Sequence, residues 1–190
     1  MPSSVDEGKV EAIELLDKLG VFEKTFYVLD VGAGMGTWYK RLSPLLPGAE
    51  WDAIEIWPEW IRRYNLTDIY NHVFAEDART IDTAKLRLGD GYDLVIYGDV
   101  LEHMSVAEAQ TVVHRLRGKV ALLSIPMAGG LYEHQTEHMH DYGTGEDFPD
   151  CPYERHLSSW TEQVVHETFN VVADWTSANM GVFVVQLGII

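Results

Sequence analysis

The sequence of 190 residues is poor in cysteine and in positive charge, with one cysteine and 14 lysines and arginines against 30 aspartates and glutamates. The single thiol, Cys151, excludes an internal disulfide, and no paired base near it indicates a thiolate site. No apolar run reaches the roughly 18 to 20 residues that cross a bilayer, and the amino end is acidic. We therefore expect a soluble, cytoplasmic protein without a membrane segment.

The shortage of basic residues also bears on partners. A formal net charge of −16 repels a polyphosphate backbone and forgoes the counterion release that favours nucleic-acid binding. Long DNA or RNA is therefore an unfavourable partner. An acidic surface can also be merely solvated, so the charge argues against partners better than it argues for any.

Apolar residues make up 46% of the chain, which suffices for one packed core, and we expect a single domain over 1–190. The opening helix is predicted from Ser4 to Gly20. Its apolar face is predicted to consist of Val10, Ile13, Leu16 and Leu19.

Short apolar runs then alternate with helical patterns. Strands are predicted at 26–31, 51–56, 71–74, 93–97, 119–125, 171–175 and 182–187, with helices at 37–45, 58–65, 78–88, 105–116 and 159–169. Ser105 with Glu108, and Ser159 with Glu162, have the spacing of capping boxes, and Gly118 is placed to end the helix before it. The alternation predicts an α/β fold with a mostly parallel sheet covered on both faces, and we expect the last strand to run antiparallel.

A glycine turn follows the first predicted strand. Gly32, Gly34 and Gly36 stand at its carboxyl end, where an open α/β sheet leaves its ligand crevice. Glu55 ends the second strand, in the position where a carboxylate can accept both ribose hydroxyls. Thr37 occupies the place of the third glycine of a dinucleotide fingerprint, which disfavours a nicotinamide-dependent oxidoreductase.

In order along the chain, four stretches resemble class I S-adenosylmethionine-dependent methyltransferases. They are Leu29-Asp-Val-Gly-Ala-Gly-Met-Gly36, Ile54-Glu55, Glu76-Asp77-Ala78, and Tyr92-Asp-Leu-Val95 running into Asp99-Val-Leu-Glu-His103. The resemblance implies a Rossmann-like methyltransferase fold, with a seven-stranded, mostly parallel sheet whose last strand is antiparallel.

The same resemblance implies roles for individual residues. Gly32, Gly34 and Gly36 would contact the methionine and ribose, and Asp30 would hold the loop or the amino group. Glu55 and Ile56 would bind the ribose, and Asp77 and Ala78 would contact the adenine. Gly98 and Asp99 would border the methionine end and the acceptor. S-adenosylmethionine is thus the expected cofactor.

Methyl transfer needs in-line positioning more than an elaborate catalytic group. A base helps where the acceptor keeps a proton, and His103 suits that role because an imidazole has an ordinary pKa of about 6.5. Glu102 is the other catalytic candidate. Alternatively, both residues cap and orient the following helix.

Asp99, Glu102 and His103 also resemble the acid-x-x-Glu-His motif of ubiquinone-pathway O-methyltransferases and Hen-type RNA 2′-O-methyltransferases, where these side chains hold a divalent metal. His156, which precedes Trp160-Thr161, resembles the remaining ligand of the RNA enzymes. Asp99 departs from the usual glutamate. Two carboxylates and two imidazoles would suit an ion that lowers the pKa of an acceptor hydroxyl.

The segment 126–157 interrupts the alternation and is predicted to form a lid on the acceptor side. It contains His134, His138 and His140 among acidic residues. Because the segment is negatively charged, we expect a neutral or cationic small-molecule acceptor. Trp38, Tyr39, Trp57 and Trp60 either stack on adenine or pack in the core. A methyltransferase-like module that binds the cofactor without turnover, and a metal-assisted RNA methyltransferase, are the open alternatives.

Overall fold

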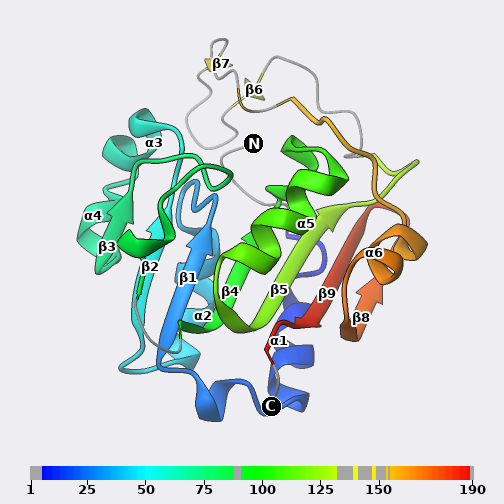
Figure 1. The fold of residues 1–190 in the computed structure, drawn as a ribbon, viewed down its shortest axis with the longest axis horizontal. Coiled ribbons are helices and arrows are strands. Elements are labelled where there is room, and N and C mark those ends of the chain that lie inside the picture. The colour runs from blue at the N-terminus through cyan, green and yellow to red at the C-terminus, as the bar shows by residue number, and fades with distance from the viewer. Residues whose placement is uncertain are drawn as a thin grey trace.

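A computed structural model describes residues 6–87, 91–131, 139–140, 147–148, 153 and 155–188. Its centre is a seven-stranded sheet with the order β3-β2-β1-β4-β5-β9-β8 (Figure 1). The strands are β1 (Tyr27–Val31), β2 (Glu50–Ile54), β3 (His72–Phe74), β4 (Tyr92–Gly98), β5 (Gly118–Pro126), β8 (Val171–Thr176) and β9 (Met180–Gln186). A separate two-stranded ladder joins β6 (Met139–His140) to β7 (Asp147–Phe148).

Helices connect the strands. The α-helices are α1 (Lys9–Lys18), α2 (Thr37–Leu42), α3 (Pro58–Arg63), α4 (Leu66–Ile69), α5 (Val106–Arg115) and α6 (Glu162–Thr168), and the 3₁₀ turns are η1 (Phe22–Lys24), η2 (Ser43–Leu45), η3 (Thr83–Lys85) and η4 (Leu101–His103). In the described part of the chain, no helix is long and apolar enough to cross a membrane.

Strand direction follows the prediction. The β1–β2, β1–β4, β2–β3 and β4–β5 pairs are parallel, whereas β9 is antiparallel to both β5 and β8. The chain moves outward from β1 to β3 and then returns to place β4 on the other side of β1. This reversal of strand order opens a crevice at the carboxyl ends of β1 and β4, where ligands of open α/β sheets bind.

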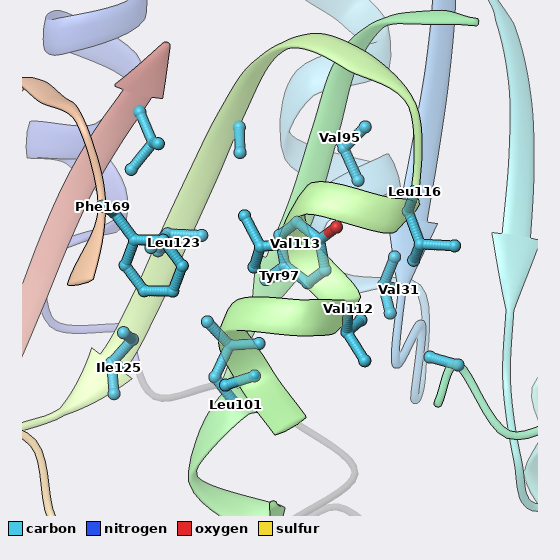
Figure 2. Close-up of a cluster of buried hydrophobic side chains, with 14 of the residues drawn as sticks. Val31, Val95, Tyr97, Leu101, Val112, Val113, Leu116, Leu123, Ile125 and Phe169 are labelled. Atoms are coloured by element: carbon cyan, nitrogen blue, oxygen red, sulfur yellow. The ribbon is translucent and has the colours of Figure 1, made fainter. Parts of the chain in front are cut away.

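Each face of the sheet has its own core. On one face, α5 covers β4 and β5, and Figure 2 shows Val112 and Val113 of this helix beside Tyr97, with Leu116 just after the helix near Val95. On the other face, α1 and α2 lie behind the sheet (Figure 1), against the alternate side chains of the same strands. Burial on both faces explains why β4 reads as a continuous apolar run without alternation.

The predicted buried face of α1 is partly wrong. Val10 is 60% exposed and Leu19 is 41% exposed, while Ala12 and Leu16 are buried. The buried stripe of α1 begins instead at Lys9. It continues through Ala12 and Leu16, which follow at helical spacing. Periodicity favoured the more apolar stripe, but contact with β8 and β9 decides which side turns inward. The predicted start at Ser4 lies outside the described residues.

Several helix ends and caps also differ from the prediction. The capping box at Ser105 and Glu108 is confirmed, but α6 is capped by Thr161, whose side chain accepts from the backbone of Val164, so the box predicted at Ser159 is wrong. Gly118 begins β5 and does not end α5. The helix predicted at 78–88 is reduced to η3, and α4 was not predicted.

The proposed lid over 126–157 lies mostly outside the described residues, as do His134, His138 and Cys151, and the side chain of His140. The lid stays a prediction.

Candidate functional site

A cavity of about 360 Å³ opens at the carboxyl ends of β1, β2 and β4. All predicted cofactor residues except Asp30 and Gly36 line it, namely Gly32, Gly34, Glu55, Ile56, Asp77, Ala78, Gly98 and Asp99. His103 also lines it, whereas Glu102 and His156 do not. The structure therefore gathers residues from loops up to about 70 positions apart, as expected where parallel strands end together.

Glu55 fastens the glycine turn. Its Oε2 accepts a hydrogen bond of 2.8 Å from the backbone N–H of Gly34, and its Oε1 accepts one of 2.8 Å from Trp57. The carboxylate is only 2% exposed. Gly34 has a φ of +53°, a left-handed conformation that glycine adopts at little cost. The carboxylate thus fixes the loop and still lies on the cavity wall.

Asp30 lies below the cavity rather than on its wall. It is buried, and its Oδ2 accepts a hydrogen bond of 2.6 Å from the hydroxyl of Tyr70. Burial raises the pKa of Asp30 to about 6, although the bond from Tyr70 acts in the opposite direction. Gly36 packs closely against Ile69, the neighbour of Tyr70. A Cβ at Gly36 would stand 2.9 Å from the Ile69 side chain. Both residues thus contact the segment of Ile69 and Tyr70 and do not line the cavity.

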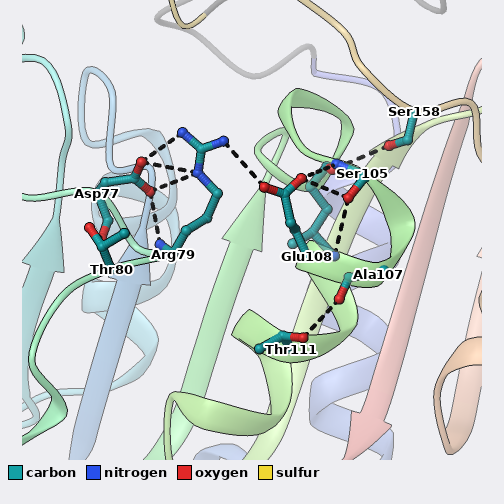
Figure 3. Close-up of polar contacts among 9 residues, drawn as sticks. Asp77, Arg79, Thr80, Ser105, Ala107, Glu108, Thr111 and Ser158 are labelled. Carbon is teal, nitrogen blue, oxygen red and sulfur yellow. Dashed lines mark hydrogen bonds and ion pairs between the residues drawn. The ribbon is translucent and has the colours of Figure 1, made fainter.

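Asp77 lines the cavity and is paired with Arg79, which links two segments of the chain. Figure 3 shows the Arg79 guanidinium between the carboxylates of Asp77 and Glu108. Burial alone would raise the pKa of Asp77, but hydrogen bonds from the side chain and backbone of Arg79 outweigh it, and the pKa is lowered. Glu108 belongs to the capping box of α5, so Arg79 links the loop after β3 to the start of that helix.

Gly98 ends β4 against the indole of Trp38. A Cβ on Gly98 would stand 1.9 Å from the Trp38 Nε1, so only glycine fits there. The next residue, Asp99, has a φ of +54° and accepts a hydrogen bond of 3.0 Å at Oδ1 from the Ser124 hydroxyl. A non-glycine residue in this conformation is uncommon and strained.

The sequence did not reveal Lys9 as part of this site. Its ammonium group has no exposed surface and lies 3.7 Å from Asp99 Oδ2, and it donates a 3.0 Å hydrogen bond to Ser124. Burial lowers the pKa of Lys9, while the nearby Asp99 opposes that shift. A lysine at the start of an amphipathic helix gives no signal that it is buried.

Glu102, His103 and His156 form a second cluster beside the cavity. Glu102 is 2% exposed, and its Oε1 lies 4.0 Å from the Nε2 of each imidazole. The backbone carbonyl of Glu102 accepts from Leu157 and Ser158, which brings the His156 segment to η4. One ligand atom from each of the three residues lies within 4.8 Å of the others, a spacing that can hold a metal ion.

Asp99 does not join this cluster, contrary to the four-ligand prediction for metal. Its carboxylate instead faces Ser124 and Lys9. The structure thus brings three of the four predicted ligands together and uses the fourth in a separate contact.

Aromatic residues, one leucine and one arginine also line the cavity. Trp38 and Trp60 line it, as do Tyr153, Arg155 and Leu157, which sequence reasoning did not single out. Tyr153 packs edge-on against Trp57, with ring centroids 5.8 Å apart. The predicted lid and the resemblance at His156 placed this part of the chain near the acceptor, but they did not single out these three side chains.

Comparisons with known proteins give a partial family match and a shared fold. Residues 29–121 match the family model of a methyltransferase domain. No curated protein matches the sequence significantly. Solved structures with the same fold include the N-terminal domain of EvdMO1 with SAH (S-adenosylhomocysteine) bound, which is 20% identical with a TM-score of 0.62 over 97% of this chain and 83% of that chain.

PH0226 from Pyrococcus horikoshii OT3 is 18% identical, with a TM-score of 0.63 over 99% of this chain and 96% of that one. An S-adenosylmethionine-dependent methyltransferase from Clostridium acetobutylicum ATCC 824 is 11% identical, with a TM-score of 0.63 over 93% and 90%. The match over residues 29–121 and the shared topology agree with the predicted resemblance: the chain has the Rossmann-like fold of class I S-adenosylmethionine-dependent methyltransferases.

Proposed function

We propose that this protein transfers a methyl group from S-adenosylmethionine to an oxygen or nitrogen atom of a small-molecule acceptor. The observation that carries the proposal is the position of Glu55, a buried carboxylate that fixes the glycine turn and lies on the cavity wall. An acceptor of two hydroxyl hydrogen bonds at that point suits a ribose.

The cavity fits such a cofactor in shape and chemistry. A volume of about 360 Å³ lies within the usual range of small-molecule pockets. Glu55 and Ile56 would hold the ribose, Asp77 and Ala78 would meet the adenine edge, and Gly98 and Asp99 would border the amino-acid end. The EvdMO1 domain has SAH bound, and magnesium protoporphyrin IX methyltransferase from Synechocystis PCC 6803, also of this fold, has SAM bound, which supports the assignment.

The bound cofactor supplies an electrophilic methyl group on sulfur. In the proposed transfer the acceptor atom would bond to that methyl carbon, while the carbon–sulfur bond would break and leave its electron pair on sulfur. His103 lines the cavity and would take the proton that the acceptor oxygen or nitrogen loses. Glu102 does not line the cavity and would orient His103 from behind.

Charge favours a small, neutral or cationic acceptor. The formal charge of −16 opposes the approach of a polyanion. A negatively charged surface attracts cations and steers them toward the cavity. Millimolar anionic analogues should therefore inhibit no better than their neutral counterparts.

Calorimetry tests the cofactor and product formation tests turnover. SAM and SAH should bind at micromolar Kd, and NADH should not. Phenols, amines and a short RNA are then tested as acceptors. We expect SAH to form with a phenol or an amine. Absence of heat with SAM and SAH would refute the proposal, whereas heat without product from any acceptor would favour a binding module without turnover.

A second candidate is metal-assisted methylation of a hydroxyl, as in the RNA 2′-O-methyltransferases. The cluster of Glu102, His103 and His156 favours it, because one carboxylate and two imidazoles are suitable ligands for Mn²⁺ or Zn²⁺. A divalent ion bound there would lower the pKa of an acceptor hydroxyl. The missing fourth ligand, Asp99, and the acidic surface make RNA the less favoured acceptor.

Metal titration with matched variants tests this candidate. Among the described residues, Glu162, His166 and Asp174 form another group with similar spacing, but all three are exposed. Mn²⁺ or Zn²⁺ should raise the Tm of the wild type and of Glu162→Gln, but not that of Glu102→Gln. No change in wild-type Tm or turnover with either metal would exclude the metal.

A further inference from the structure

Lys9 is a lysine without exposed surface in the described structure, and no predicted role explains it. Its Nζ donates to the Ser124 hydroxyl at 3.0 Å, and that hydroxyl donates to Asp99 Oδ1 at 3.0 Å. Its Nζ also lies 3.7 Å from Asp99 Oδ2 and 4.4 Å from the centroid of the Trp38 ring. Two of these three partners, Asp99 and Trp38, line the cavity.

Burying an ammonium group is costly unless charge and hydrogen bonds compensate it. The compensation here comes from one carboxylate, one hydroxyl and one aromatic face, all at the carboxyl ends of β4 and β5 or at the start of α2. A methionine would fill the same space without that cost. We therefore look for the effect of this charge on its partners, of which Asp99 and Trp38 line the cavity.

The surrounding backbone is shaped to deliver this side chain. Gly8 has a φ of +84°, and a Cβ on it would stand 2.8 Å from Val182, so the start of α1 lies directly on the sheet. The preceding Glu7 accepts hydrogen bonds from the Ser177 hydroxyl at 2.5 Å and from the Asn179 amide at 3.2 Å. The two residues that precede Lys9 are thus fixed on the sheet and on the loop between β8 and β9.

We propose that Lys9 is a positioning residue of the methyl-donor site, which holds the Asp99 carboxylate and the Trp38 indole in the orientation that the amino-acid end of the cofactor meets. This inference rests on the proposed function, since it assigns Gly98 and Asp99 to that end. Lys9 itself does not line the cavity, so it acts through Asp99 and Trp38. Without the ammonium group, the strained Asp99 loses one of its two described side-chain partners.

A double-mutant cycle tests the coupling. Wild type, Lys9→Met, Asp99→Asn and the double variant are compared for SAH binding by calorimetry. Lys9→Met should weaken Kd at least tenfold in the wild-type background and less than twofold in the Asp99→Asn background, because the interaction it removes is then already lost. Lys18→Met, at the exposed end of the same helix, is the matched control and should leave Kd unchanged.

The outcomes separate this inference from the proposed function. Failure of the wild type to bind SAH refutes both. Wild-type binding combined with equal effects of Lys9→Met in both backgrounds, or with no effect, refutes the role of Lys9 alone. If Lys9→Met does not fold, as judged by thermal unfolding, Lys9→Gln, which removes the charge and keeps a polar end, takes its place in the cycle, and the same absence of coupling to Asp99 would overturn the inference.

Discussion

Glu55 and Glu102 are both 2% exposed and both follow the carboxyl end of a parallel strand, yet their surroundings differ. Glu55 accepts hydrogen bonds from two backbone N–H groups. Glu102 faces two imidazoles at 4.0 Å. Backbone donors cannot titrate or leave, whereas imidazoles can change charge or bind metal.

Under the proposed function, the cofactor side of the crevice would be preorganised by fixed donors, and the acceptor side would hold groups that can take a proton or an ion. Rigid backbone contacts suit a ligand that is always the same, such as the cofactor. Adjustable side chains suit the step in which the acceptor loses a proton. Replacing buried carboxylates by their amides tests this contrast.

Glu55→Gln should have the largest effect. An amide offers one acceptor oxygen, and its NH₂ group would face a second backbone donor, so one buried N–H of Gly34 or Trp57 loses its partner. We expect at least a 30-fold rise in the SAH Kd and a loss of about 3 kcal/mol of stability. Calorimetry and urea unfolding measure both, and a Kd within twofold of wild type would contradict the role of Glu55.

Asp30→Asn should change the pH dependence of stability. The folded pKa of Asp30 is raised to about 6, so between about pH 4 and 6 the folded state keeps a proton that the unfolded state has lost. Wild-type stability from Asp30 therefore falls as pH rises through this window, and the penalty persists above it. Each pKa unit corresponds to about 1.4 kcal/mol, which gives roughly 2 to 3 kcal/mol.

Urea unfolding from pH 4 to 7 measures the difference between wild type and Asp30→Asn, in which the contributions of the other carboxylates cancel. The exposed Asp6→Asn is the control and should follow the wild type. Parallel curves for wild type and Asp30→Asn would show that burial does not perturb Asp30.

Gly98→Ala probes the boundary between the two sides. The new Cβ would collide with Trp38 Nε1, so the indole must move or the strand must shift. We expect a loss of about 2 kcal/mol of stability and weaker SAH binding. Combining it with Trp38→Leu, which removes the colliding atoms, should recover part of the stability. No recovery would mean that the backbone, not the indole, is the obstacle.

Glu102→Gln should have the smallest effect on the cofactor. Because Glu102 does not line the cavity, the SAH Kd should stay within twofold of wild type, in contrast to the matched change at Glu55. Calorimetry on the same preparation used for metal titration measures it. A tenfold change would place Glu102 among the cofactor contacts and remove the contrast between the two sides.

Much of the fold could be predicted because its signals are local. The apolar runs of β1, β4 and β5, the glycines after β1 and the capping box at Ser105 each lie within a few neighbouring residues. Glu55 could be placed for the same reason, since it stands just after a strand, whereas Asp77 was placed by the resemblance to methyltransferases. The inward side of α1 and the Thr161 cap could not, because packing between distant segments decided them.

The sequence by itself determined a parallel sheet with a glycine turn and acidic residues at the strand ends, since strand period and turn chemistry are short-range properties. Only the tertiary structure decided that Lys9 meets Asp99 across 90 positions, that Tyr70 supports Asp30, and that His156 joins Glu102. These contacts depend on how helices and loops pack on the finished sheet, and no local pattern encodes that packing.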